Sequence, residues 1–196
     1  MDASTEQQLL EELLEAGTYK SSVLNSTSDV EETLKTALRK WSGEKDTSSV
    51  YVCFFASSSS REEGGVRTSF SWAPSGSGEA RADQRPETVK RFDINGTSGE
   101  SAGNYSMLYF KCVLPGDLRR PSRHALLRAR ASNTSHSERK GTDEAMRQHL
   151  SFVYLMSRRV TEALGCENEP LKVDPVVKPA LAKNSEVPPG SLAFEK

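Results

Sequence analysis

Two segments near opposite ends of the chain repeat apolar residues at helical spacing. Residues 4–16 place four leucines at this spacing and are followed by Gly17, a typical helix stop. Residues 143–164 carry apolar side chains three or four positions apart and are followed by Gly165. The pattern therefore predicts a helix near each end, the second being the longer.

A third helix is predicted by a capping signal. Asp29 is followed three residues later by Glu32, which is the spacing of a capping box, and an apolar stripe continues from there to Trp41. We therefore expect a helix with Asp29 as its N-cap, preceded by a Ser/Thr-rich connector over residues 18–28.

Two runs of β-branched and aromatic residues predict strands. Residues 50–56 are apolar without alternation, which is typical of a strand buried on both faces of a sheet, and residues 105–114 form the second run. A shorter apolar patch covers residues 66–72, whereas residues 93–104 are polar and predict a flexible loop. We expect the two main strands to be parallel neighbours, joined by a right-handed crossover through residues 77–92.

The C-terminal segment has the composition of a tail. After Pro170 it carries four further prolines and little hydrophobic periodicity, so we expect residues 169–196 to be disordered. The predicted organisation is then an N-terminal helical extension and linker at 1–28, a domain at 29–168 and this tail.

Composition narrows the class of protein. The chain has 196 residues, of which 35% are hydrophobic, and a formal net charge of −1. This length suits one domain with a modest core, and no apolar run is long enough to span a membrane. The acidic, polar N-terminus argues against a signal peptide, so we expect a cytoplasmic protein without a membrane partner. Three widely spaced cysteines predict neither a disulfide framework nor a metal cluster.

Charge is distributed unevenly along the chain. Residues 1–50 hold ten acidic and five basic side chains, whereas residues 111–160 hold eleven basic and four acidic ones. Because the total charge is near zero and no RNA-binding motif is present, we interpret the basic part as a solvated face and disfavour a nucleic-acid partner. A candidate site for an anion or a peptide within it consists of Arg119, Arg120, Arg123 and Arg128.

One motif carries a family resemblance. The strand at 50–56 is followed by a glycine-containing loop and then by Ser71-Trp72-Ala73-Pro74-Ser75-Gly76. This order resembles the thioredoxin-related, Clot-like family of small cytosolic thioredoxin-domain proteins, whose members carry Ser-Trp-Cys-Pro-Asp-Cys after the corresponding strand. The second strand, which leads into Pro115-Gly116-Asp117, is also similar, and the resemblance covers about residues 30–128.

The resemblance implies a fold and a degenerate active site. It implies an α/β, thioredoxin-like three-layer sandwich with a mainly parallel central sheet and with Trp72 at the start of a helix. Ala73 and Gly76 stand where the family has its redox cysteines, and thiol–disulfide exchange needs both thiols. We therefore expect a non-catalytic module without metal or cofactor, which uses the segment from Trp72 through Pro74 and Ser75 to Gly76 to bind another protein.

Two alternatives remain. The first is a divergent oxidoreductase that uses a single cysteine, Cys166, which we expect to be exposed, whereas Cys53 and Cys112 fall in predicted strands and suit structural positions. The second is a small RNA-binding subunit, because Ser49-Val50-Tyr51, residues 126–129 and the long last helix resemble the smaller Alu-domain protein of the signal recognition particle. Against it, residues 132–142 lack the strand character which that protein would require. The histidines, His124, His136 and His149, show no metal-ligand spacing.

Overall fold

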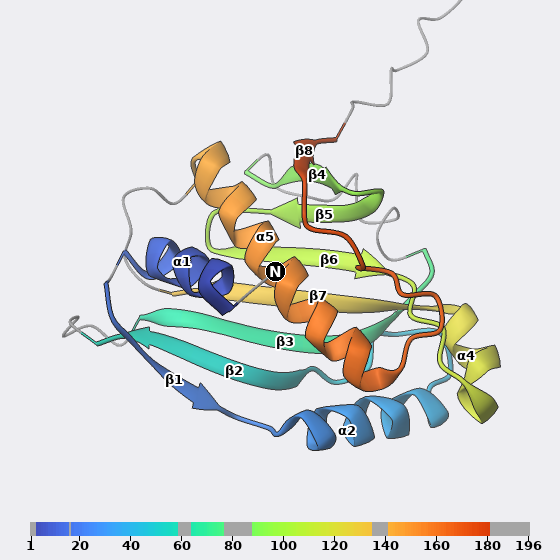
Figure 1. Cartoon of the computed structure of the whole chain (residues 1–196). Helices are drawn as coiled ribbons and strands as arrows, with labels where there is room; N and C mark the ends of the chain where they lie inside the picture. Colours follow the sequence, from blue (N-terminus) through green and yellow to red (C-terminus); the bar gives the residue numbers. More distant parts are fainter. Residues whose placement is uncertain (1–2, 16, 59–63, 77–87, 135–140, 181–196) are drawn as a thin grey trace, which may run out of the picture.

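The computed structural model describes residues 3–15, 17–58, 64–76, 88–134 and 141–180, which form one antiparallel sheet with helices packed on one of its faces (Figure 1). In chain order the elements are α1 (Ala3–Leu14), β1 (Tyr19–Val23), α2 (Thr27–Arg39), β2 (Val50–Ser57), β3 (Gly65–Pro74), β4 (Lys90–Ile94), β5 (Thr97–Ser101), β6 (Tyr105–Phe110), the 3-10 turn η2 (Gly116–Leu118), α4 (Arg119–Arg123), β7 (Ala125–Asn133), α5 (Asp143–Leu164) and β8 (Val177–Pro179).

The strand order contradicts the expected sheet. Among the described residues the sheet has eight strands in the order β1-β2-β3-β7-β6-β5-β4-β8, and every neighbouring pair is antiparallel. Strands β2 and β6 correspond to the two main predicted strands, but β3 and β7 lie between them. The mainly parallel sheet was therefore wrong. The apolar run at 50–56 is not covered on both faces as expected, because Tyr51 is exposed and only Val50 and Phe55 of β2 are buried.

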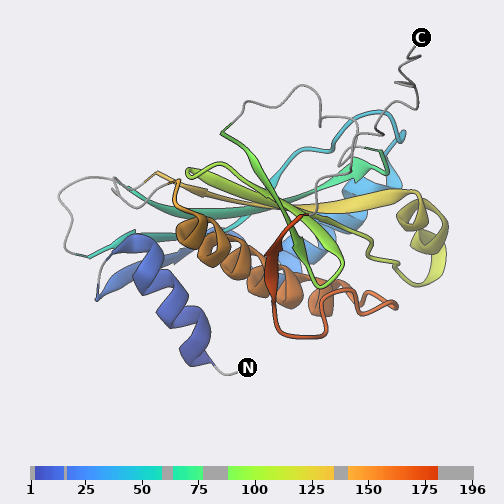
Figure 2. The same ribbon diagram turned by 90° about the horizontal axis from the view of Figure 1, so that it is seen from above.

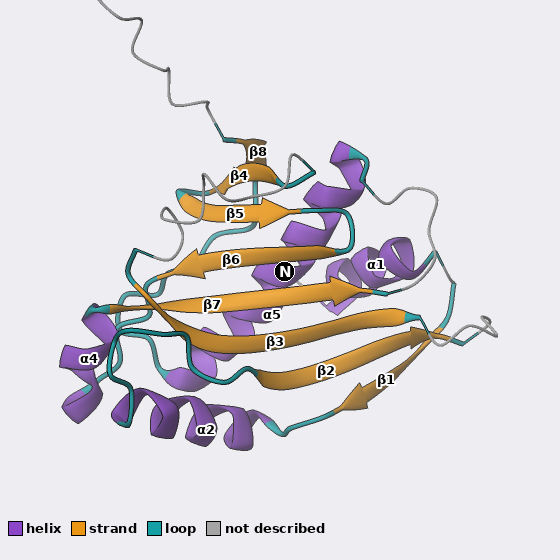
Figure 3. Ribbon diagram, turned by 180° about the vertical axis from the view of Figure 1, so that it is seen from behind, coloured by secondary structure: helices purple, strands orange, loops and turns teal. Residues whose placement is uncertain are grey.

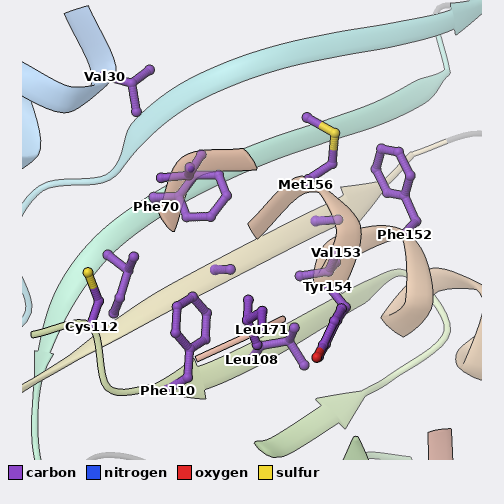
Figure 4. Close-up of a cluster of buried hydrophobic side chains, with 14 of the residues drawn as sticks. Val30, Phe70, Leu108, Phe110, Cys112, Phe152, Val153, Tyr154, Met156 and Leu171 are labelled. Atoms are coloured by element: carbon purple, nitrogen blue, oxygen red, sulfur yellow. The ribbon is translucent and has the colours of Figure 1, made fainter. Parts of the chain in front are cut away.

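The molecule has two layers rather than the three of the predicted sandwich. Helices α1, α2 and α5 all cover the same face of the sheet, as the view from above and the view from behind both show (Figures 2 and 3). Between this face and α5 lies the core, which includes Phe70, Phe110, Phe152 and Met156 (Figure 4). The opposite face of the sheet carries no helix in the described part of the chain, and we call it the open face.

The two helices predicted near the ends of the chain are both present, as α1 and α5. In α5 the Thr142 Oγ1 accepts a hydrogen bond from the backbone N–H of Ala145 at 3.2 Å, and Gly165 ends the helix with a φ of 72°. Leu10, Leu13 and other apolar residues of α1 are buried in the same core as α5. The helical spacing of the apolar residues thus predicted both elements.

The N-terminus of α2 lies earlier than expected. Ser26 is its N-cap, and it forms a capping box in which its hydroxyl accepts from the N–H of Asp29 and the Asp29 carboxylate accepts from the N–H of Ser26. Asp29 is therefore the third residue of the helix rather than its cap. Two overlapping segments, Ser26 to Asp29 and Asp29 to Glu32, match the capping pattern, and the sequence alone does not choose between them.

Four short strands lie where a connector, a crossover, a loop or a tail was expected. Strand β1 falls within the predicted connector. Strand β5 lies within the predicted polar loop at 93–104 and forms a hairpin with β4, which begins in the predicted crossover at 77–92. At the C-terminal side, Leu171 is buried and β8 pairs with β4, so the expected tail was wrong for residues 170–180. Residues 181–196 of that tail lie outside the described residues.

Gly99 of β5 lies where helix α5 and the neighbouring strands leave no space for a side chain. A Cβ at this position would lie 2.5 Å from Ile94 Cδ1 and 3.1 Å from Leu150 Cδ2. We expect Gly99→Ala to lower the free energy of unfolding by about 1–3 kcal/mol, because the core has no space for the added methyl group. Urea denaturation followed by circular dichroism measures this.

The matched control is Gly76→Ala, since no atom lies within 4 Å of a Cβ at Gly76. Its expected effect is within about 0.5 kcal/mol. Equal destabilisation by the two substitutions would contradict the close approach of α5 to β5.

Candidate functional site

The centre of the open face carries a strip of arginine and aromatic side chains from four adjacent strands. Paired residues of an antiparallel sheet share a face, so the register identifies its members. We call it the arginine–aromatic strip, and it consists of Tyr51 and Phe54 of β2, Arg67 of β3, Arg130 of β7 and Tyr105 of β6.

Each arginine of the strip stacks on aromatic rings. The guanidinium carbon of Arg67 lies 5.5 Å from the centre of the Tyr51 ring and 5.4 Å from that of Phe54. The guanidinium carbon of Arg130 lies 5.3 Å from the centre of the Tyr105 ring. Because Ser69 is the partner of Arg130, the two arginines are diagonal neighbours in the middle of the strip. The strip therefore runs from ring to arginine to arginine to ring.

The strip is accessible and positively charged. Arg67 and Arg130 are exposed, and Tyr51 is 45% exposed. Among the described residues neither arginine of the strip forms a salt bridge. Arg128 lies two residues before Arg130 on β7 and differs from it, because Arg128 forms a salt bridge with the carboxylate of Asp46. The positive charge of Arg67 and Arg130 is thus directed to solvent.

The segment predicted as a degenerate active site lies at the end of β3. Trp72 is a strand residue, fully buried on the helix-covered face, where its Nε1 donates a hydrogen bond to the carbonyl of Leu34 at 2.8 Å. Ala73 and Pro74 complete the strand, and the Ser75 hydroxyl donates to the carbonyl of His124 at 2.6 Å. Trp72 therefore does not open a helix, which corrects the arrangement that the resemblance implied.

The four arginines of the predicted anion site are divided between two places. Arg119, Arg120 and Arg123 are exposed on α4, at one end of the sheet, and Arg119 forms a salt bridge with Glu167 at 2.9 Å. Arg128 lies on β7 in the open face. The structure thus separates Arg128 from the other three and brings it close to the strip.

Two of the three cysteines form a disulfide. Cys112 follows β6, Cys166 follows α5, and their Cα atoms are 5.1 Å apart. Cys166 is 7% exposed, so its expected exposure was wrong. The free cysteine, Cys53, is half-buried on β2, and burial raises the pKa of its thiol while the charge of Arg159 lowers it to a smaller extent. A raised pKa leaves less of the reactive thiolate at neutral pH, which disfavours single-cysteine chemistry.

The two described histidines lie on different parts of the fold. His149 is buried on α5, His124 is exposed after α4, and His136 lies outside the described residues. The part of the chain that the structure describes contains no group of residues suited to hold a metal ion. No described helix is long and apolar enough to cross a membrane.

Sequence reasoning missed the strip, although one of its strands carries a readable signal. In residues 125–131, alanine or leucine occupies every buried position, and Arg128 and Arg130 alternate with them. This period of two predicts that both arginines lie on one face of a strand. Nothing in the sequence, however, shows that Arg67 and the rings of β2 and β6 lie beside them.

Comparisons with known proteins do not extend these observations. No family model, curated protein or solved structure matches this chain.

Proposed function

We propose that the protein is a non-catalytic module that binds single-stranded nucleic acid on the open face of its sheet. The arginine–aromatic strip is the observation that carries this proposal. Exposed rings on a sheet stack on unpaired bases, and arginine side chains beside them bind the phosphates. The open face has rings on β2 and β6 and arginines on β3 and β7 between them, so it offers both kinds of contact.

Charge complementarity favours an anionic polymer over other occupants. Arg67 and Arg130 are held by rings rather than by carboxylates, so binding a phosphate does not require breaking a described salt bridge. Lys20 of β1 is exposed on the same face. It lies two residues before Ser22, which pairs with Phe54 of the strip. The strip spans three strand spacings, roughly 14 Å, which accommodates a short extended segment of a strand.

The thioredoxin-like interpretation is incompatible with this fold. It required a parallel sheet and a helix that begins after Trp72, whereas the sheet is antiparallel and Trp72 is buried within β3. A binding role is still compatible with the structure. The alternative to a nucleic acid on the open face is a protein partner.

The test measures binding of labelled oligo(U) and oligo(dT) of about 12 nucleotides, within the site sizes of sheet-based binders, by fluorescence anisotropy at increasing salt. We expect binding that weakens with salt. Replacing Arg67 and Arg130 together with alanine should make the slope of log K against log salt about 1.4 less negative, since two phosphate contacts are lost. Tyr105→Ala should weaken binding about tenfold or more through lost stacking.

Arg120→Ala combined with Arg123→Ala is the matched control, because it removes the same charge from α4 instead of the open face. This control should bind nearly as the parent does. Equal weakening by the two double variants would overturn the assignment to the strip. Absence of binding at about 50 mM salt, where phosphate contacts are much stronger than at about 200 mM, would overturn the function and favour a protein partner.

A further inference from the structure

Strand β1 leaves one edge of the sheet unpaired. The N–H of Leu24 donates to Val52 at 2.8 Å and the N–H of Ser58 donates to Thr18 at 3.1 Å, so the even-numbered residues of this segment bond to β2. Because bonding alternates along an antiparallel strand, the backbone groups of Tyr19, Ser21 and Val23 are directed to the free edge. No described element lies beyond this edge (Figures 1 and 3).

This edge is complementary to a second copy of itself. In an antiparallel pair centred on Ser21, the two copies of Ser21 exchange two hydrogen bonds, and each Tyr19 exchanges two with Val23 of the other copy. Six bonds then use all the outward backbone groups of both strands. The only charged residue of the strand, Lys20, faces Ser22 of the other copy, so no like charges are directly opposite.

The same register also covers exposed apolar surface. Val23 is 71% exposed and Leu24 is 46% exposed, two of the few large apolar side chains that the described part of the chain leaves in solvent. Val23 shares the helix-covered face with Tyr19, whose ring packs edge-on against Phe55 with centres 6.0 Å apart. In the pair, Val23 of each copy lies against Tyr19 of the other and is removed from water.

We propose that two copies of this chain associate through β1 and form one continuous sheet. The two-fold axis of such a pair is perpendicular to the sheet, so both open faces lie on the same side. The two copies of Lys20 then become diagonal neighbours at the centre and link the two arginine–aromatic strips into one basic surface. This association extends the proposed nucleic-acid site, since each copy contributes half of the surface, but its test needs no nucleic acid.

Sedimentation velocity of the full chain, from about 5 to about 500 µM to cover weak association, should show a concentration-dependent dimer. Ser21→Pro removes the central outward N–H and should raise the dissociation constant at least tenfold, whereas Ser21→Ala keeps this N–H and should leave it unchanged. An edge strand tolerates proline where its N–H faces solvent. Val23→Lys, which replaces an exposed apolar side chain, should also weaken the dimer and covers the case in which the proline variant fails to fold.

Crosslinking tests the register directly. In a Cys53→Ala background, Ser21→Cys should form a disulfide between copies under mild oxidation, because the two Cα atoms would be about 5.5 Å apart. Thr33→Cys, at an exposed position of α2, is the control and should crosslink more slowly. A protein that stays monomeric, a dimer that Ser21→Pro leaves intact, or equal crosslinking at both positions would overturn the proposal. A dimer that binds no oligonucleotide would support this association and refute only the proposed function.

Discussion

Loss of the Cys112–Cys166 disulfide is expected to lower the free energy of unfolding by about 4 kcal/mol. The bond joins residues 54 positions apart, and the chain-entropy model gives this magnitude for a loop of that length. Cys112 follows β6 and Cys166 follows α5, so the bond fixes the end of the long helix to the sheet. In the unfolded chain, this bond closes a loop that contains the residues of β7 and α5 and so limits the conformations that they can adopt.

Thermal unfolding with and without a strong thiol reductant measures this effect, as does Cys112→Ala combined with Cys166→Ala. A loss of about 4 kcal/mol corresponds to a fall in Tm of roughly 8–16 °C for a chain of this size. Cys53→Ala is the control, because it removes one half-buried atom and should cost less than about 1 kcal/mol. A Tm that reduction leaves unchanged would show that this bond does not stabilise the protein.

The helices were predictable because burial on one side repeats with the period of the helix. Leu150, Val153 and Leu164 of α5 are buried, and in the sequence they recur at the spacing of one helical face. The sequence could therefore report these elements without any knowledge of their partners. The capping box of α2 was less decisive, since two overlapping patterns competed within the seven residues 26–32.

The strand topology was not predictable in the same way. Four of the five residues of β1 are exposed, so this strand has almost no hydrophobic pattern to read. The long pairing of β3 with β7 determines the whole sheet, yet its partners, such as Phe70 and Ala129, are far apart in sequence. The apolar run of β2 does not show which strands lie beside it, and it does not indicate deep burial either, because only Val50 and Phe55 of this strand are buried.

The candidate site illustrates the same limit. Its central arginines, Arg67 and Arg130, belong to β3 and β7, which three other strands of the sheet separate in the sequence, and the rings that hold them come from β2 and β6. The Trp-Ala-Pro motif can be recognised in the sequence because its residues are consecutive. The strip is assembled only by the order of the strands, so its members become neighbours only in the folded sheet.

Trp72→Ala is expected to lower the free energy of unfolding by about 3–5 kcal/mol, the usual cost of removing a large buried ring. The side chain is 0% exposed, and its Nε1 bonds to Leu34 of α2, so it connects the sheet to that helix. Its backbone also exchanges hydrogen bonds of 2.9 Å with Thr47, in the segment before β2. Trp72→Phe keeps most of the ring but loses the bond to Leu34, for a smaller expected cost of about 1–2 kcal/mol.

Urea denaturation followed by circular dichroism separates these variants, and Tyr51→Ala is the informative control. Tyr51 is an aromatic strand residue like Trp72, but it is 45% exposed on the open face. Its removal should change the free energy of unfolding by less than about 1 kcal/mol, since little buried area is lost, while oligonucleotide binding weakens through lost stacking. A surface role for Trp72, as the sequence motif suggested, requires the opposite result, with Trp72→Ala leaving stability unchanged. Together, Trp72→Ala and Tyr51→Ala distinguish the face of the sheet that stabilises the fold from the face to which we assign binding.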